Sequence, residues 1–103
     1  MQFLLIAHDG DDDQALDRRM RARDKHIALG DKMVAEGQML YGGAILDDAG
    51  NMTGSVLVLD FPDRAELDAW LKIEPYVTGD VWRTIDVQLP DGHTTYSKGA
   101  KIS

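Results

Sequence analysis

The order of four short apolar runs and two helical segments constrains the fold of this chain more than any other feature of its sequence. The apolar runs cover residues 2–8, 38–46, 55–61 and 81–89, and each ends at residues that favour turns. A helical pattern of about 24 residues follows the acidic cluster 11–13 and ends at Glu36, and a second covers residues 63–72. A segment rich in Gly, Asn and Asp joins the second and third runs, which predicts a β-hairpin.

This order, β-α-β-β-α-β, is that of the ferredoxin-like fold. We therefore expect an α+β protein with an antiparallel four-stranded sheet and both helices on one face. The 103 residues suit a single hydrophobic core, and no linker or repeat interrupts them. Residues 1–90 are expected to form one domain, followed by a polar C-terminal tail over residues 91–103.

The charge balance argues against nucleic acid and membranes as partners. The formal net charge of −7 would repel phosphate groups and anionic lipid surfaces. The first ten residues lack a basic start, and their apolar run is too short to span a bilayer. The chain has no cysteine, which suits a reducing compartment, and we expect the cytoplasm.

Several apolar runs lack the alternation that a half-solvated sheet requires. A sheet with helices on one face and water on the other should alternate apolar and polar residues, yet residues 3–7 and 56–59 are apolar throughout. An exposed apolar sheet face would aggregate, and most homo-oligomers are two-fold dimers. The sequence therefore predicts a homodimer whose sheets pack face to face.

The first helix carries a narrow apolar stripe that we expect to face the sheet. At 100° per residue, the stripe consists of Leu16, Met20, Ile27 and Val34, with Arg23 among them. A buried arginine needs a carboxylate partner, and so one is expected for Arg23. The opposite, solvated side is expected to hold Arg18, Arg21, Lys25 and Lys32.

One flank of this stripe brings together His26, Arg19 and Gly30. Gly30 costs about 1 kcal/mol relative to alanine inside a helix, and it leaves space beside the imidazole. That space favours a ligand site at His26. The same residues also fit a structural histidine at the edge of the core, hydrogen-bonded to the backbone.

Glu74 is the candidate carboxylate partner for this site. Pro75 restricts the preceding residue to extended geometry, so the backbone aims the Glu74 side chain. An exposed glutamate at a helix stop is the alternative. Tyr76 would add a phenol to the same pocket, and the glycines 42–43 indicate a bulge or a close backbone approach.

The sequence contains no motif for a metal or a nucleotide. His8, His26 and His93 have no metal-ligand spacing, and neither a phosphate-binding loop nor a G-x-S-x-G motif is found. We therefore expect no metal and no cofactor.

Several short motifs occur in one order and spacing. They are R-x-x-H at 23–26, EG at 36–37, GG at 42–43, TGSVLVLDF at 53–61, AW at 69–70 and EPYVTGDVW at 74–82. Together, over about residues 2–90, they resemble the YciI-like family. The resemblance implies a dimeric α+β barrel, similar to that of muconolactone isomerase, and an active-site pair of histidine and acid at His26 and Glu74.

Two positions depart from the family pattern. Glu74 stands where the family usually has aspartate, and Gly43 and Ala44 stand where Gly-Pro is common. The extra methylene of Glu74 displaces its carboxylate by about one carbon-carbon bond, and catalytic geometry tolerates such changes poorly.

We expect a small enzyme of proton-transfer chemistry, an isomerase or lyase that acts on a small organic acid or ring substrate. His26 would be the general base or acid, and Glu74 would orient the imidazole or exchange a second proton. Arg23 would bind Glu74 or a substrate carboxylate. Tyr76 and Gly43 would line the substrate pocket. The alternatives are a non-catalytic module that binds a small metabolite and a dimeric interaction scaffold with a structural histidine.

Overall fold

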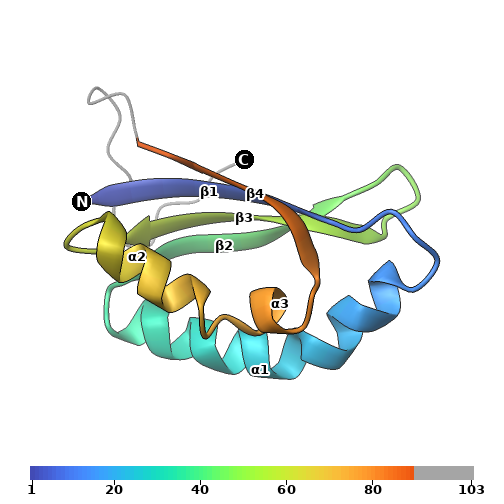
Figure 1. The fold of residues 1–103 in the computed structure, drawn as a ribbon, viewed down its shortest axis with the longest axis horizontal. Coiled ribbons are helices and arrows are strands. Elements are labelled where there is room, and N and C mark those ends of the chain that lie inside the picture. The colour runs from blue at the N-terminus through green and yellow to red at the C-terminus, as the bar shows by residue number, and fades with distance from the viewer. Residues whose placement is uncertain (90–103) are drawn as a thin grey trace.

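The computed structural model of the protein describes residues 1–89 and shows a sheet with helices packed against it (Figure 1). The elements are β1 (Gln2–Asp9), α1 (Ala15–Ala35), β2 (Met39–Leu46), β3 (Met52–Asp60), α2 (Arg64–Leu71), α3 (Pro75–Thr78) and β4 (Trp82–Gln88). The predicted α+β fold with four antiparallel strands is confirmed. The predicted tail, residues 91–103, lies outside the described residues.

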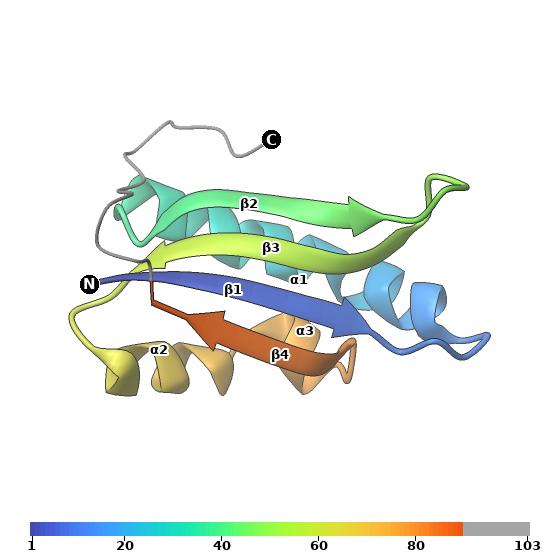
Figure 2. The same ribbon diagram turned by 90° about the horizontal axis from the view of Figure 1, so that it is seen from above.

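The four strands form one sheet in the order β2-β3-β1-β4, with every neighbouring pair antiparallel. All three helices lie on one side of the sheet (Figure 1). Seen from above, α1 runs beneath β2 and β3, whereas α2 and α3 lie toward the β4 edge (Figure 2). The β2–β3 register shifts between Met39 and Tyr41, next to the two glycines that predicted a bulge.

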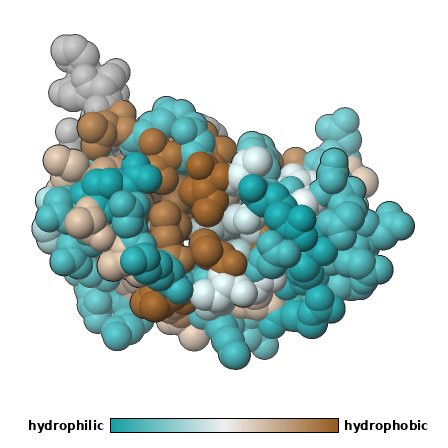
Figure 3. All heavy atoms as spheres, in the orientation of Figure 1, coloured by the Kyte–Doolittle hydropathy of each residue, from teal (hydrophilic) through white to brown (hydrophobic). Residues whose placement is uncertain are grey.

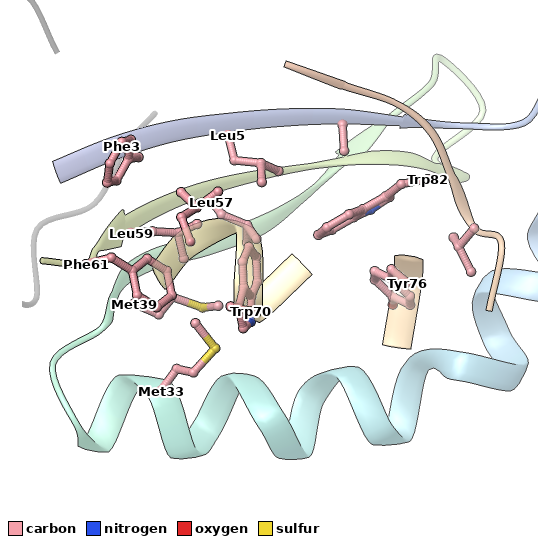
Figure 4. Close-up of a cluster of buried hydrophobic side chains, with 13 residues drawn as sticks. Phe3, Leu5, Met33, Met39, Leu57, Leu59, Phe61, Trp70, Tyr76 and Trp82 are labelled. Atoms are coloured by element: carbon pink, nitrogen blue, oxygen red, sulfur yellow. The ribbon is translucent and has the colours of Figure 1, made fainter. Parts of the chain in front are cut away.

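The hydrophobic core fills the space between the sheet and the helices, because alternate residues of β1 and β3 point toward α1 and α2. The core residues are Phe3, Leu5, Ala7, Met33, Met39, Leu57, Leu59, Phe61, Leu67, Trp70, Tyr76, Val81 and Trp82 (Figure 4). On the side of the molecule seen in Figure 3, hydrophobic side chains gather in the middle, between the sheet and α1, and hydrophilic ones cover the end where α1 begins.

Helix α1 begins at Ala15, a few residues later than the sequence predicts. Its N-cap residue, Gln14, makes no capping hydrogen bond through its side chain. Of the acidic cluster, Asp12 accepts a hydrogen bond from the Gln14 backbone N–H and pairs with Arg18 at 2.6 Å. Arg18 thereby lies largely covered, not on a freely solvated side as predicted, and its guanidinium lowers the pKa of Asp12 well below the usual range.

The prediction for the buried side of α1 is wrong. Its apolar stripe is exposed, at 40% for Leu16, 51% for Met20, 43% for Ile27 and 45% for Val34. The inward side instead carries Arg19, Ala22, His26, Leu29 and Met33. The reason is that α1 turns Arg19 and His26 toward the interior, where each is paired with a carboxylate. These pairings offset the cost of burying polar side chains in place of apolar ones.

A short helix, α3, occupies the segment that the sequence leaves as a broken stretch. Glu74 is its N-cap, Pro75 is its first residue, and Gly79 follows its last turn. Proline is well suited to the first position, since its missing N–H would have no helical partner there. This turn places Tyr76 beneath the sheet, beside Trp82 of β4 (Figure 4).

The sheet face opposite the helices is apolar at its centre. The β1–β3 register places Leu4 opposite Val58 and Ile6 opposite Val56 on that face, and the β2–β3 register adds Tyr41. The sequence-based expectation of strands that are apolar on both faces therefore agrees with the register. Within residues 1–89, no helix has the length and apolar character required to cross a membrane.

Candidate active site

His26 of α1 and Glu74 at the start of α3 form a hydrogen-bonded pair, 48 residues apart in sequence. The bond joins Nδ1 of His26 to Oε1 of Glu74. The Glu74 side chain is 1% exposed and that of His26 is 12% exposed. Burying an unpaired carboxylate costs several kcal/mol, and the imidazole N–H supplies the partner that this carboxylate requires.

The backbone around Pro75 fixes the position of the Glu74 carboxylate. Glu74 has the extended geometry expected before proline, with φ −65° and ψ 123°. Its Oε1 also accepts a hydrogen bond of 3.1 Å from the Tyr76 backbone N–H, as an N-cap side chain does. The same oxygen therefore caps α3 and holds the imidazole.

Two aromatic rings fix the orientation of the His26 imidazole. The Tyr76 ring stacks on it, with ring centroids 3.8 Å apart and planes at 13°, and the Trp82 ring lies at 6.0 Å with planes at 78°. Nδ1 is bonded to Glu74, while Nε2 has no hydrogen-bond partner among residues 1–89. The imidazole is thus held at one nitrogen and available to a ligand at the other.

A buried arginine lies next to this pair. The Arg19 Nη1 donates to both carboxylate oxygens of Asp9, at 3.2 and 3.1 Å, and the two side chains are 4% and 3% exposed. The guanidinium also lies 4.7 Å from the centroid of the Tyr76 ring. Its Nη2 donates to Oγ of Ser55 at 3.1 Å, and so does Nε1 of Trp82, also at 3.1 Å.

A cavity of about 310 Å³ opens between α1 and the β2 side of the sheet. His26, Arg19, Arg23 and Asp31 supply its polar lining, together with Ser55. Apolar and small residues form the remaining wall: Ile27, Gly30, Val34, Met39, Gly42, Gly43, Ala44, Met52, Leu57 and Tyr76. This volume suits a ligand of about one ring with its substituents.

Glycines keep the cavity open. A Cβ on Gly30 would meet only the end of the Met39 side chain, at 3.9 Å, so this position leaves room in the helix wall. A Cβ on Gly42 would lie 3.0 Å from Sδ of Met39 and 3.1 Å from Leu57, closer than ordinary packing allows. The two glycines therefore shape the helix side and the sheet side of the same cavity.

Burial raises the pKa of the Tyr76 hydroxyl above its ordinary value. The charges of Arg19 and Arg23 oppose this shift but are the smaller causes. Because the ordinary pKa is already near 10, Tyr76 is a neutral phenol at physiological pH. Its ring forms an aromatic wall of the cavity, and its neutral hydroxyl is not a base.

The structure brings the five predicted site residues to one place. His26, Arg23, Tyr76 and Gly43 line the cavity, and Glu74 lies behind His26. Arg23, however, is not the buried, carboxylate-paired arginine that the helical pattern predicts. That residue is Arg19, whereas Arg23 is partly exposed at the cavity and makes no ion pair within the described part of the chain.

The sequence reasoning missed Asp9, Ser55 and Trp82. Asp9 looks like part of an acidic turn, but a register shift in the β1–β4 pairing directly before it sets it beside Arg19. Ser55 is the one polar residue within the apolar run from Ser55 to Leu59, and its isolation there is the signal that could have identified it. In the sequence, Trp82 cannot be distinguished from an ordinary core residue.

The described residues hold no group of three or more metal-ligating side chains. His8 is exposed at the end of β1, away from the cavity lining. His93 lies outside the described residues.

Comparison with known proteins connects this chain to one family. The family model described as the YCII-related domain matches residues 1–89. A similar solved structure is 5-chloro-2-hydroxyhydroquinone dehydrochlorinase (TftG) from Burkholderia phenoliruptrix AC1100 in complex with 2,5-dihydroxybenzoquinone, at a TM-score of 0.76 and 21% identity over 88% of this chain and 94% of that one. At that identity the match shows a shared fold. No curated protein sequence matches this chain.

Proposed function

This chain belongs to the YCII-related domain family, and we propose that it is a small enzyme in which His26 transfers a proton to and from a ring or enolisable organic acid in the cavity. The observation that carries this proposal is the pairing of a buried Glu74 with one imidazole nitrogen while the other remains free beside the cavity. The reaction would be an isomerisation or an elimination, both of which begin with removal of a proton from carbon or oxygen.

Glu74 gives the imidazole its chemical role. When the Nδ1–H of His26 donates a hydrogen bond to Oε1 of Glu74, the lone pair of the neutral imidazole resides on Nε2, which can accept a proton from the substrate. The carboxylate then stabilises the imidazolium that forms. In an isomerisation, the Nε2–H returns the proton to another substrate atom. In an elimination, the electron pair of the broken bond expels a leaving group from the substrate, and the Nε2–H then gives its proton to that group or to solvent.

The longer side chain of Glu74 does not prevent this pairing. The carboxylate reaches Nδ1 while also accepting the Tyr76 N–H, so the extra methylene is accommodated by the turn that begins α3. The similar dehydrochlorinase is in complex with a dihydroxylated quinone, a single substituted ring of the size that this cavity suits. That likeness supports a ring substrate here.

Thermal shift measurements test ligand binding at this site. We expect 2,5-dihydroxybenzoquinone or another small hydroxylated ring to raise the Tm of the wild type, since a ligand at one hundred times its Kd stabilises the native state by about 2.7 kcal/mol. His26→Ala should weaken this shift and remove any turnover. An unchanged shift without turnover in either protein would favour a binding module. The absence of any ligand shift, together with a lower Tm of His26→Ala, would favour a scaffold.

We also propose that two copies pair through the open faces of their sheets. Leu4, Ile6 and Val56 on that face are apolar and only partly buried in the single chain, and a second identical face is the simplest cover for them. We infer the cytoplasm as the compartment, because a chain without cysteine has no need of an oxidising one.

Sedimentation should therefore give about twice the chain mass of 11.4 kDa. Val56→Asp, which sets a charge in the middle of the open face, should give a folded monomer. Ile73→Asp is the matched control: Ile73 is 63% exposed next to α2, on the helix side, and its replacement should leave the mass unchanged. A wild-type mass near that of one chain at micromolar concentration would refute the dimer.

A further inference from the structure

Ser55 lies in β3, on the sheet face that lines the cavity, and is 1% exposed. Its neighbours across the sheet are Ala7 of β1 and Ala44 of β2. Both are small, so the sheet is hollowed around the serine. A buried polar side chain normally has hydrogen-bond partners, and those of Ser55 come from other elements.

The hydrogen bonds around Ser55 determine whether its hydroxyl can donate a hydrogen bond to a ligand or accept one from it. The Arg19 guanidinium and the Trp82 indole both donate to Oγ, each at 3.1 Å. Neither group can accept a hydrogen bond in return, because both carry only N–H donors. A hydroxyl oxygen has two lone pairs, and both are taken. The O–H group of Ser55 remains as a hydrogen-bond donor, and it has no acceptor among residues 1–89.

We propose that the Ser55 hydroxyl donates a hydrogen bond to a carbonyl, phenol or enolate oxygen of the ligand. The Arg19 charge polarises this hydroxyl through Nη2, and a polarised donor binds best to an oxygen that carries negative charge. Trp82 donates a hydrogen bond to Ser55 through Nε1, and its ring packs edge to face against His26. Trp82 therefore links the Ser55 donor to the His26 base.

This inference rests on the proposed function and specifies its substrate class. In an enolisation, the substrate C–H bond breaks, the proton moves to Nε2 of His26, and the electron pair becomes the C=C bond while the carbonyl oxygen becomes an enolate. Ser55 would hold that oxygen, and reversal of the electron flow returns a proton from Nε2 to carbon.

The charges favour a carbonyl or phenol oxygen over a carboxylate at Ser55. Asp9 already matches the charge of Arg19, so this end of the cavity offers a donor without an unmatched positive charge. Arg23, which has no ion pair within residues 1–89, is the group to which a carboxylate elsewhere on the ligand would bind.

Binding of para-nitrophenolate, measured by its visible absorbance, tests the proposal without any turnover. Ser55→Ala should bind this phenolate about tenfold more weakly than the wild type, the effect of losing one hydrogen bond to a charged oxygen. Ser55→Thr, which keeps the hydroxyl, should bind within about threefold of the wild type. Para-nitroanisole, whose ether oxygen is an uncharged and weaker acceptor, should lose much less affinity than the phenolate on Ser55→Ala, within about threefold.

Equal binding of the phenolate by folded Ser55→Ala, or failure of the wild type to bind it, would overturn the proposal. If Ser55→Ala does not fold, Ser55→Cys decides, since it keeps the shape of the side chain but donates far more weakly; phenolate affinity equal to the wild type would again refute the assignment. A failure of His26 to catalyse proton exchange would leave these binding results unchanged, so the two proposals can fail separately.

Discussion

Replacing Asp9 with alanine is expected to lower the free energy of unfolding by about 3–5 kcal/mol, because it leaves the Arg19 charge buried without its partner. Both side chains are almost fully excluded from solvent, and the guanidinium donates to both Asp9 oxygens. The loss is a large part of the total stability of a domain of this size. Urea denaturation followed by circular dichroism measures it.

A double variant separates pairing from packing. Asp9→Leu combined with Arg19→Met removes both charges, and we expect it to lose less stability than Asp9→Ala alone, since a buried ion pair contributes little beyond the cost of its own burial. Asp68→Ala is the control for an exposed pair. It breaks the half-exposed Arg64–Asp68 bridge of α2 and should change stability by less than about 1 kcal/mol. A loss in Asp9→Ala as small as in this control would show that Arg19 is solvated.

Replacing Glu74 with glutamine is expected to slow proton transfer by a factor on the order of 10² to 10⁴. The amide is nearly the same size but lacks the charge that stabilises the imidazolium. Its NH₂ group can also donate to Nδ1, which would move the imidazole proton to Nε2 and remove the base. Nitrogen-15 NMR of His26 reports which nitrogen is protonated, and the rate of proton exchange reports the loss.

Glu74→Asp is the informative companion variant. It keeps the charge and restores the residue that is usual at this position in the family, so we expect a rate within about tenfold of the wild type. A Glu74→Gln protein as fast as the wild type would show that Glu74 is only an N-cap of α3. The Tm of each variant controls for loss of that capping bond.

Most of the fold could be predicted from the sequence because it follows from local patterns. Apolar runs, turn residues and Pro62 and Pro75 define the strands and helices, and their order restricts the topology to few choices. The short helix α3 escaped this reasoning, since four residues carry too little periodicity to distinguish a turn from a helix.

The side of α1 that faces the sheet could not be predicted from hydrophobicity. Its apolar stripe has the right period, yet the inward side includes Arg19 and His26, whose burial depends on partners from other parts of the chain. Asp9 and Glu74 are those partners, and only the folded chain brings them close. The glutamate was found because Pro75 restricts its backbone locally, whereas the position of Asp9 depends on a register shift that the sequence does not reveal.

The central claim is that His26 moves protons in the cavity, and deuterium exchange tests it most directly. Proton NMR in D₂O would follow loss of the ring hydrogens of 2,5-dihydroxybenzoquinone with wild type and with His26→Gln. We expect the wild type to accelerate the exchange well beyond the rate without protein, and His26→Gln to lose at least about 10²-fold of that acceleration while still binding the ring. Equal exchange rates with both proteins, at concentrations where both bind the ring, would contradict the claim.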